Sequence, residues 1–142
     1  MRRRRLTASQ SAALMLLTIT SVPAHASVPT TATPLHDVVC TSTIGTPFKS
    51  TATAVGVYGE VRCNYSPDAA VTTVQLQRKV NGVFQNFGNS VSSSSTATYL
   101  RIYDGAGVSS GCHRFRGRIH REAFHGTWGY TTKYGTPVDI CF

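Results

Sequence analysis

Hydrophobic and polar side chains alternate in short runs from residue 37 to the end of the chain, and no stretch shows the periodicity and caps of a helix. Successive side chains of a β-strand face opposite sides of a sheet, so this pattern predicts strands. The clearest run covers residues 111–121, and we expect it to have a solvated basic face and an inner, partly apolar face. The basic face would hold Cys112, Arg114, Arg116, Arg118 and His120, and the inner face His113, Phe115, Gly117, Ile119 and Arg121.

The same alternation predicts strands over 38–41, 55–65, 74–80 and 98–102, and a last strand over 138–142. The second of these strands has an inner face expected to hold Val55, Val57, Gly59, Val61, Cys63 and Tyr65. In the third strand, Val74 and Leu76 alternate with Gln75 and Gln77, which places the two glutamines on the opposite, polar face.

Turn residues separate these runs. Asn81 and Gly82 lie between two valines and predict a two-residue type I′ hairpin, because both tolerate a positive φ. The serine-rich segment 90–95 predicts a loop, and Asp-Gly-Ala-Gly at 104–107 predicts a turn. The fold expected is an all-β, antiparallel, immunoglobulin-like β-sandwich of about seven strands.

The first 26 residues have the form of a secretory signal peptide, which is removed from the mature protein. Arg2 to Arg5 form its positive start, an apolar run covers 11–22, and Ala24-His25-Ala26 is a small-x-small cleavage site. The arginines followed by Leu6 also match a twin-arginine signal weakly, so the Sec and twin-arginine routes both stay open. We expect a secreted, extracellular protein.

Loss of the signal peptide halves the net charge. The whole chain has a formal charge of +8, but residues 27–142 carry 10 Lys and Arg against 6 Asp and Glu, a net charge of +4. That charge is ordinary for a soluble domain and does not by itself indicate nucleic-acid binding. No other long apolar run exists, so we expect no membrane span. Residues 27–36 predict a flexible N-terminal arm and 37–142 a single domain.

An even number of cysteines after a signal peptide predicts two disulfides formed in an oxidising space. The four are Cys40, Cys63, Cys112 and Cys141. Cys40 and Cys63 share their strand faces with valines, whereas Cys112 shares a face with arginines and Cys141 with an aspartate. We therefore favour the pairs 40–63 and 112–141. A 63–112 bridge, like that of antibody domains, would require an inner and an outer cysteine to meet. The spacings do not suit a metal site.

The 112–141 pairing implies one long hairpin with residues 124–128 at its tip. Arg114 should then lie opposite Asp139. Pro137 cannot donate a hydrogen bond to a ladder, so the returning arm should be an edge strand or carry a bulge there.

These features resemble a broad group of small secreted four-cysteine β-sandwich proteins of actinobacteria. The resemblance rests on an arginine-rich signal peptide, an early cysteine on a strand, Val-Arg-Cys-Asn-Tyr at 61–65, Val-x-Leu-Gln-Arg followed by Asn-Gly within 74–82, and Gly-Cys-His-Arg-Phe-Arg at 111–116. It covers roughly residues 37–142. It implies the fold and secretion, and no particular activity.

Two sets of side chains on the predicted hairpin are candidates for binding. A basic ladder offers planar, bidentate donors to phosphates or an acidic polysaccharide, although a merely solvated strand face would look the same. An aromatic tip could anchor a protein or stack on a sugar, unless Trp128 folds back into the core. The ladder is Arg114, Arg116, Arg118 and His120, and the tip is Phe124, His125, Trp128 and Tyr130, with Tyr134 further along.

His120, Glu122 and His125 form a compact acid–base set. With Arg118 they supply the residue types of a small secreted ribonuclease: a carboxylate base, a histidine acid and an arginine for the phosphate. A zinc site formed by His113, His120 and His125 is disfavoured, because the first two face opposite sides of the strand.

The function expected is that of a secreted, non-enzymatic binding or structural module without a cofactor. Its partner would be an acidic polymer, a cell-surface polysaccharide or a protein. The alternative is a secreted hydrolase of nucleic acid that uses His120, Glu122 and His125, and a secreted protease inhibitor is the least favoured class.

Overall fold

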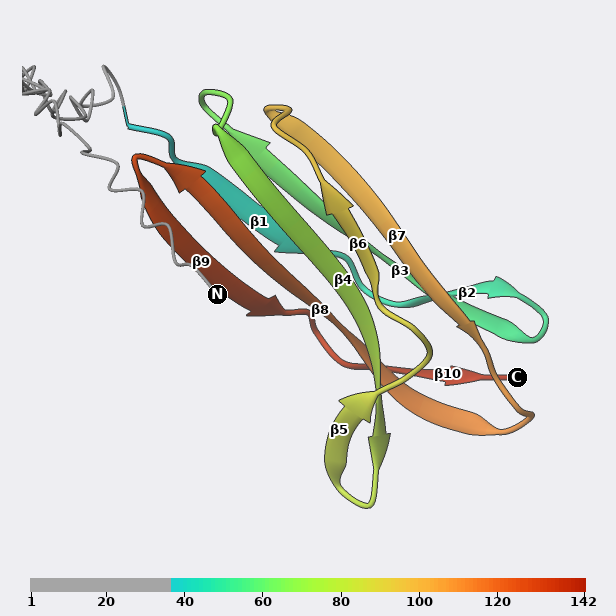
Figure 1. Cartoon of the computed structure of the whole chain (residues 1–142). Helices are drawn as coiled ribbons and strands as arrows, with labels where there is room; N and C mark the ends of the chain where they lie inside the picture. Colours follow the sequence, from blue (N-terminus) through green and yellow to red (C-terminus); the bar gives the residue numbers. More distant parts are fainter. Residues whose placement is uncertain (1–36) are drawn as a thin grey trace, which may run out of the picture. The chain divides into compact units, whose positions relative to one another are not determined.

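The computed structural model describes residues 37–142, and the predicted signal peptide and N-terminal arm lie outside the described residues. The described chain folds into ten antiparallel β-strands that form two sheets (Figure 1). The strands are β1 (Cys40–Ile44), β2 (Phe48–Thr51), β3 (Ala54–Cys63), β4 (Ala69–Val80), β5 (Val83–Asn86), β6 (Val91–Ser94), β7 (Tyr99–Gly107), β8 (Cys112–His125), β9 (Thr127–Tyr134) and β10 (Val138–Cys141). This part of the chain contains no helix, and hence none that could span a membrane.

Each sheet is built on long central strands. In the first sheet, β3 pairs with β7 along one edge and with β1 and β2 along the other. In the second sheet, β4 and β8 lie side by side in the middle (Figure 1). The free edge of β4 pairs with β5 and β6, and that of β8 with β9 and β10. All-β architecture is therefore confirmed.

The core lies between the two sheets and is supplied by alternate residues of their long strands. Its buried members are Val55, Val57, Val61, Val74, Leu76, Ile102, Val108, Phe115 and Ile119. The sheets approach closely at Gly59, where an added Cβ would lie 2.6 Å from a methyl of Val74. The inner faces expected for the segments 111–121 and 55–63 are confirmed, because their apolar members are buried there.

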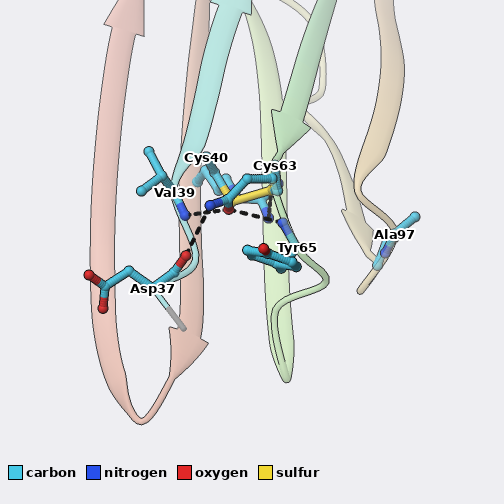
Figure 2. Close-up of a disulfide and its surroundings, with 9 residues drawn as sticks. Asp37, Val39, Cys40, Cys63, Tyr65 and Ala97 are labelled. Atoms are coloured by element: carbon cyan, nitrogen blue, oxygen red, sulfur yellow. Dashed lines mark hydrogen bonds between the residues drawn. A yellow bond between two sulfur atoms is a disulfide. The ribbon is translucent and has the colours of Figure 1, made fainter. Parts of the chain in front are cut away.

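Both predicted disulfides are present. Cys40–Cys63 joins β1 to β3 (Figure 2), and Cys112–Cys141 joins β8 to β10. Each bridge connects residues that are direct partners in an antiparallel ladder. The face argument succeeded because cross-strand partners always project from the same side of a sheet. Two disulfides indicate an oxidising, extracellular environment.

The long hairpin is confirmed in its main features. β8 pairs with β9 through a turn at Gly126, and Arg114 lies opposite Asp139 as predicted. Residues 135–137 lie opposite only two residues of β8, between the partners Arg118–Tyr134 and Phe115–Val138. This extra residue is the irregularity expected at Pro137, and it divides the returning arm into β9 and β10.

The Asn81-Gly82 turn is also confirmed. Val80 pairs with Val83, and the two residues between them have φ values of 50° and 84°. Positive φ at both central positions matches the type I′ turn predicted for the link between β4 and β5.

Two segments predicted as loop or turn are strands. Within 90–95, residues 91–94 form β6, which pairs with β4, and the hydroxyls of Thr73 and Ser92 lie 2.7 Å apart across this pair. Serine favours turns in general, but here β4 offers a free edge that the backbone completes. The 104–107 segment continues β7, because Gly105 lets that strand lie close to the carbonyl of Val55.

Three further predictions are corrected. The chain has ten described strands rather than about seven, since β2 and β6 are added and the returning arm is divided. Tyr65 is exposed because β3 ends at Cys63. Gln75 and Gln77 are buried, because the end of β5 and the residue that follows it bond to them. The Gln75 amide donates to the carbonyl of Phe87, and the Gln77 amide donates to the side-chain oxygen of Asn86.

Candidate functional site

The outward side of the β8–β9 hairpin collects most of the predicted site residues. Phe115 and Ile119 of β8 are fully buried, so the even-numbered residues of this strand face away from the core. Direct partners in β9 share that side. We call this surface the hairpin face; it comprises Arg116, Arg118, His120, Glu122, Phe124, Trp128, Tyr130, Thr132 and Tyr134.

Three exposed aromatic side chains follow β9 along the hairpin face. Trp128, Tyr130 and Tyr134 are 52%, 66% and 53% exposed. The rings of Trp128 and Tyr130 are stacked with centroids 6.5 Å apart, and the ring of Phe124 packs against that of Trp128 with centroids 5.4 Å apart. The alternative in which Trp128 folds into the core is therefore wrong. Large, rigid, half-exposed rings of this kind are typical of recognition surfaces.

The basic ladder divides into three different situations. Arg114 lies 3.6 Å from Asp139 in an exposed ion pair. Arg116 is held between the rings of Phe84 and Tyr134, at 4.2 and 4.3 Å, and its Nε donates to Gln77. Arg118 lies between Gln75 and Tyr134 in the ladder and has no ion-pair partner among the described residues. Arg118 is thus the arginine of the hairpin face that is available to an acidic ligand.

The proposed acid–base set is only partly assembled. His120 lies 3.2 Å from the Glu122 carboxylate through Nε2 and 2.7 Å from the Thr132 hydroxyl through Nδ1. His125 projects from the opposite side of β8, where its Nδ1 lies 3.1 Å from Asp68. Because β8 pairs regularly with β9 from 118 to 125, residues 122 and 125 cannot face the same way. The structure therefore brings His120 and Glu122 together and leaves His125 apart.

The third described histidine, His113, does not join the other two. His113 lies near the carbonyl of Ser109, at the start of β8 and on the side opposite His120. Across residues 37–142, no three His, Cys, Asp or Glu side chains converge in a way that could hold a metal ion.

A pocket that sequence reasoning missed lies on the inner side of the same hairpin. It has a volume of about 470 Å³ and is bordered by the chain segment 37–40 and by residues of β8 and β9, including Arg121 and His125. The signal in the sequence was an arginine at an inner position of a strand, two residues after Ile119. Its significance depends on the surroundings of that arginine, which only the fold defines.

No protein-family model, curated protein or solved structure matches this chain.

Proposed function

We propose that this protein is a secreted, non-enzymatic binding module with an immunoglobulin-like β-sandwich fold, and that its hairpin face binds an acidic polysaccharide. The observation that carries this proposal is the placement of three exposed aromatic rings beside an arginine without an ion-pair partner, on one side of one hairpin. The all-β fold and the two disulfides are compatible with a secreted protein of this kind.

The aromatic residues supply the surface for sugar rings. The apolar C–H face of a sugar packs on an aromatic ring, while the hydroxyls of both tyrosines and nearby polar groups can hydrogen-bond to the sugar edges. Trp128 and Tyr134 are six residues apart along β9, which corresponds to about 20 Å of strand. A surface of that length suits several units of a polymer better than one small sugar.

The charges favour an acidic polymer over a neutral one. Arg118 places a positive charge on β8, directly opposite Tyr134 of β9. Its guanidinium matches the geometry of a carboxylate. Glu122, the acidic group of the hairpin face, already lies within 3.2 Å of His120. The net charge of residues 27–142, +4, also attracts polyanions.

Nucleic-acid hydrolysis is less well supported. In general acid–base catalysis, the acid and the base must both reach the reacting bond of one bound substrate. His125 projects from the side of β8 opposite to His120 and Glu122. His120 and Glu122 alone, with Arg118, would have to provide both proton transfers and phosphate binding.

The experiment uses Trp128, the single tryptophan of the chain, as its reporter. Polygalacturonate is titrated into the oxidised protein while tryptophan emission is recorded, and dextran serves as the neutral polymer. We expect a saturable change with polygalacturonate that weakens as salt is added, because exposed charges are screened. Tyr130→Ala should weaken binding by about tenfold or more, as expected for a central aromatic anchor.

The matched control is Tyr103→Ala, which changes another exposed tyrosine, on the other sheet, and should leave binding unchanged. No saturable response to polygalacturonate, or an equal loss in both tyrosine variants, would contradict the proposal. Cleavage of RNA by the wild-type protein that disappears in His120→Ala would favour the hydrolase instead.

A further inference from the structure

Arg121 is buried beside the inner pocket without a charged partner. Its side chain is 3% exposed, and its one hydrogen bond runs from Nη2 to the sulfur of Cys63, at 3.3 Å. Nε and Nη1 are buried and have no hydrogen-bond partner among the described residues. A disulfide sulfur is a weak acceptor, so the positive charge and the Nε and Nη1 N–H groups are left uncompensated. A buried, unpaired charge costs several kcal/mol in general, which makes this arrangement unusual in a finished core.

The acidic residues of the chain do not supply the missing partner. The first 36 residues contain no Asp or Glu. Of the six acidic side chains, five are engaged elsewhere: Glu60 with Arg101, Asp68 with His125, Asp104 with the backbone of Leu76, Glu122 with His120 and Asp139 with Arg114. The sixth is Asp37.

Asp37 lines the pocket but forms no ion pair with Arg121. Its backbone carbonyl accepts a hydrogen bond from the Asn64 amide, which holds the segment before β1 against the end of β3. Figure 2 shows the Asp37 carboxylate directed away from the Cys40–Cys63 bridge, whose Cys63 sulfur is the atom that Arg121 contacts. The guanidinium is therefore left for a ligand.

We infer that the inner pocket binds a small organic acid through a single carboxylate, with Arg121 as the group that receives the anion. A volume of about 470 Å³ lies in the range of small-molecule sites. Arg121 is the one Lys or Arg that lines the pocket, so it neutralises a monoanion, whereas a phosphate dianion would leave a buried negative charge. Thr127 and Thr131 of β9 supply hydroxyl groups for the remainder of the ligand.

The pocket and the hairpin face border each other at Phe124 and Tyr130, but Arg121 does not belong to the hairpin face. The side chains of Arg121, Thr127 and Thr131 project from the side of β8 and β9 opposite to Arg118 and Tyr134, because successive residues of a strand alternate in direction. Loss of the Arg121 guanidinium is therefore not expected to abolish polymer binding at the hairpin face.

The test uses the oxidised protein, with sodium glucuronate and sodium acetate as probes and sodium chloride and sodium phosphate at matched ionic strength as controls. Ligands that bind only the folded state raise its melting temperature in a saturable way. We expect a saturable rise of several degrees with glucuronate, a smaller one with acetate, and a smaller, non-saturating change with chloride and phosphate. Equal responses to all four salts would overturn the inference.

Two substitutions locate the response. Arg121→Met removes the guanidinium and keeps an unbranched side chain, and should abolish the rise with glucuronate. Arg62→Met is the matched control, since Arg62 is an exposed arginine on β3 next to Cys63. A glucuronate response that survives Arg121→Met, or disappears in Arg62→Met, would contradict the site.

The Nε–H resonance of Arg121 and the Asp37→Asn variant provide two further tests of the site. If Arg121→Met does not fold, the Nε–H resonance of Arg121 in the wild-type protein should still shift saturably with glucuronate, and an unmoved resonance overturns the inference. Asp37→Asn should keep the glucuronate response. A response that appears only in Asp37→Asn would mean that Asp37 itself neutralises Arg121, and would also overturn it.

Discussion

The two buried charged side chains, Asp104 in β7 and Arg121 in β8, have opposite surroundings. Asp104 is 5% exposed, and its Oδ2 accepts a 2.6 Å hydrogen bond from the backbone N–H of Leu76 in the other sheet. Arg121 is buried to the same degree but contacts a disulfide sulfur and borders a pocket. Burial raises the pKa of the Asp104 carboxyl, and backbone hydrogen bonds from Leu76 and Gly105 partly offset it; burial lowers the pKa of the Arg121 guanidinium.

This difference suggests different roles: the Asp104 carboxyl stabilises the fold, whereas the Arg121 guanidinium binds a ligand. Asp104 ties one sheet to the other, because its carboxylate accepts hydrogen bonds from the backbone N–H groups of Leu76 and Gly105. Arg121 is neutralised by no described residue, and space for a partner lies beside it. Substitutions should therefore act in opposite directions in the two regions: loss of Asp104 weakens the fold, and loss of Arg121 strengthens it.

The largest effect is expected from removal of the disulfide that Arg121 contacts. Cys40→Ala combined with Cys63→Ala opens a loop with a sequence separation of 23 and should lower the free energy of unfolding by about 3 kcal/mol. Urea denaturation measures this loss. Removal of Cys112–Cys141, with a separation of 29, should cost a similar amount but leave the glucuronate response intact. If the two disulfide variants lost the glucuronate response equally, the response would not depend specifically on the Cys40–Cys63 bridge that Arg121 contacts.

Asp104→Leu is expected to have the second largest effect. It removes the acceptor for the buried N–H of Leu76, and an unsatisfied buried donor costs about 1–3 kcal/mol. Asp104→Asn keeps an acceptor oxygen and should cost much less in the same urea experiment. Equal losses in the two variants would show that the Leu76 hydrogen bond is not what Asp104 contributes.

Arg121→Met should raise the stability of the ligand-free protein by about 1 kcal/mol, because it removes a buried charge that lacks a partner. Chemical denaturation in a buffer without carboxylates measures this gain. The matched Arg62→Met change, at an exposed position, should alter stability little. If Arg121→Met still folds but is less stable than the wild type, the Arg121 guanidinium contributes a net stabilising interaction and is not an unpartnered charge.

The pH dependence of stability gives a smaller, signed effect. The pKa of Asp104 is raised in the folded state, so the folded protein holds this proton more tightly than the unfolded chain does. The resulting contribution to the free energy of unfolding is present below the ordinary carboxyl pKa and is lost as pH rises through the folded pKa. Glu60 has the opposite sign: the hydrogen bond from Arg101 is the main cause that lowers its pKa, so its contribution is lost as pH falls.

Relative to the wild type, Asp104→Asn should therefore gain stability as pH rises from acidic values towards neutral. Glu60→Gln should lose stability over the same change. Melting curves at several pH values provide the measurement, and parallel profiles for the two variants would contradict the assigned signs.

The smallest effect is expected at the exposed pair Arg114–Asp139, whose atoms are 3.6 Å apart. Surface ion pairs of this kind contribute about 0–1 kcal/mol, so Asp139→Asn should change the free energy of unfolding by no more than that. A double-mutant cycle with Arg114→Gln isolates the pair. A coupling free energy between Arg114 and Asp139 as large as the stability lost in Asp104→Leu would show that exposed charges stabilise this protein as much as buried ones do.

Prediction from sequence worked where structure is local. Alternation assigned the faces of β8 and of most of β3, cross-strand parity gave both disulfides, and Asn81-Gly82 gave its turn. It failed at 91–94 and 104–107, where serine and glycine suggested turns. There a neighbouring strand with a free edge decided the conformation, because paired backbone hydrogen bonds outweigh a weak local preference.

The candidate sites show the same division. The residues of the hairpin face could be named from the sequence, since a hairpin with a known register places every second residue on one side. The separation of His125 from His120 follows from the regular pairing of β8 with β9 through residue 125, and sequence reasoning had left that unresolved.

By itself, the sequence determined the inward position of Arg121, because an alternating strand leaves each residue one choice of face. It also determined that the first 36 residues could offer no carboxylate. Only the tertiary structure decided that the five other acidic groups are engaged elsewhere, that Asp37 forms no ion pair with Arg121 and that a pocket lies beside it. The face of a side chain is set by local backbone geometry, whereas its partners are set by which strands become neighbours.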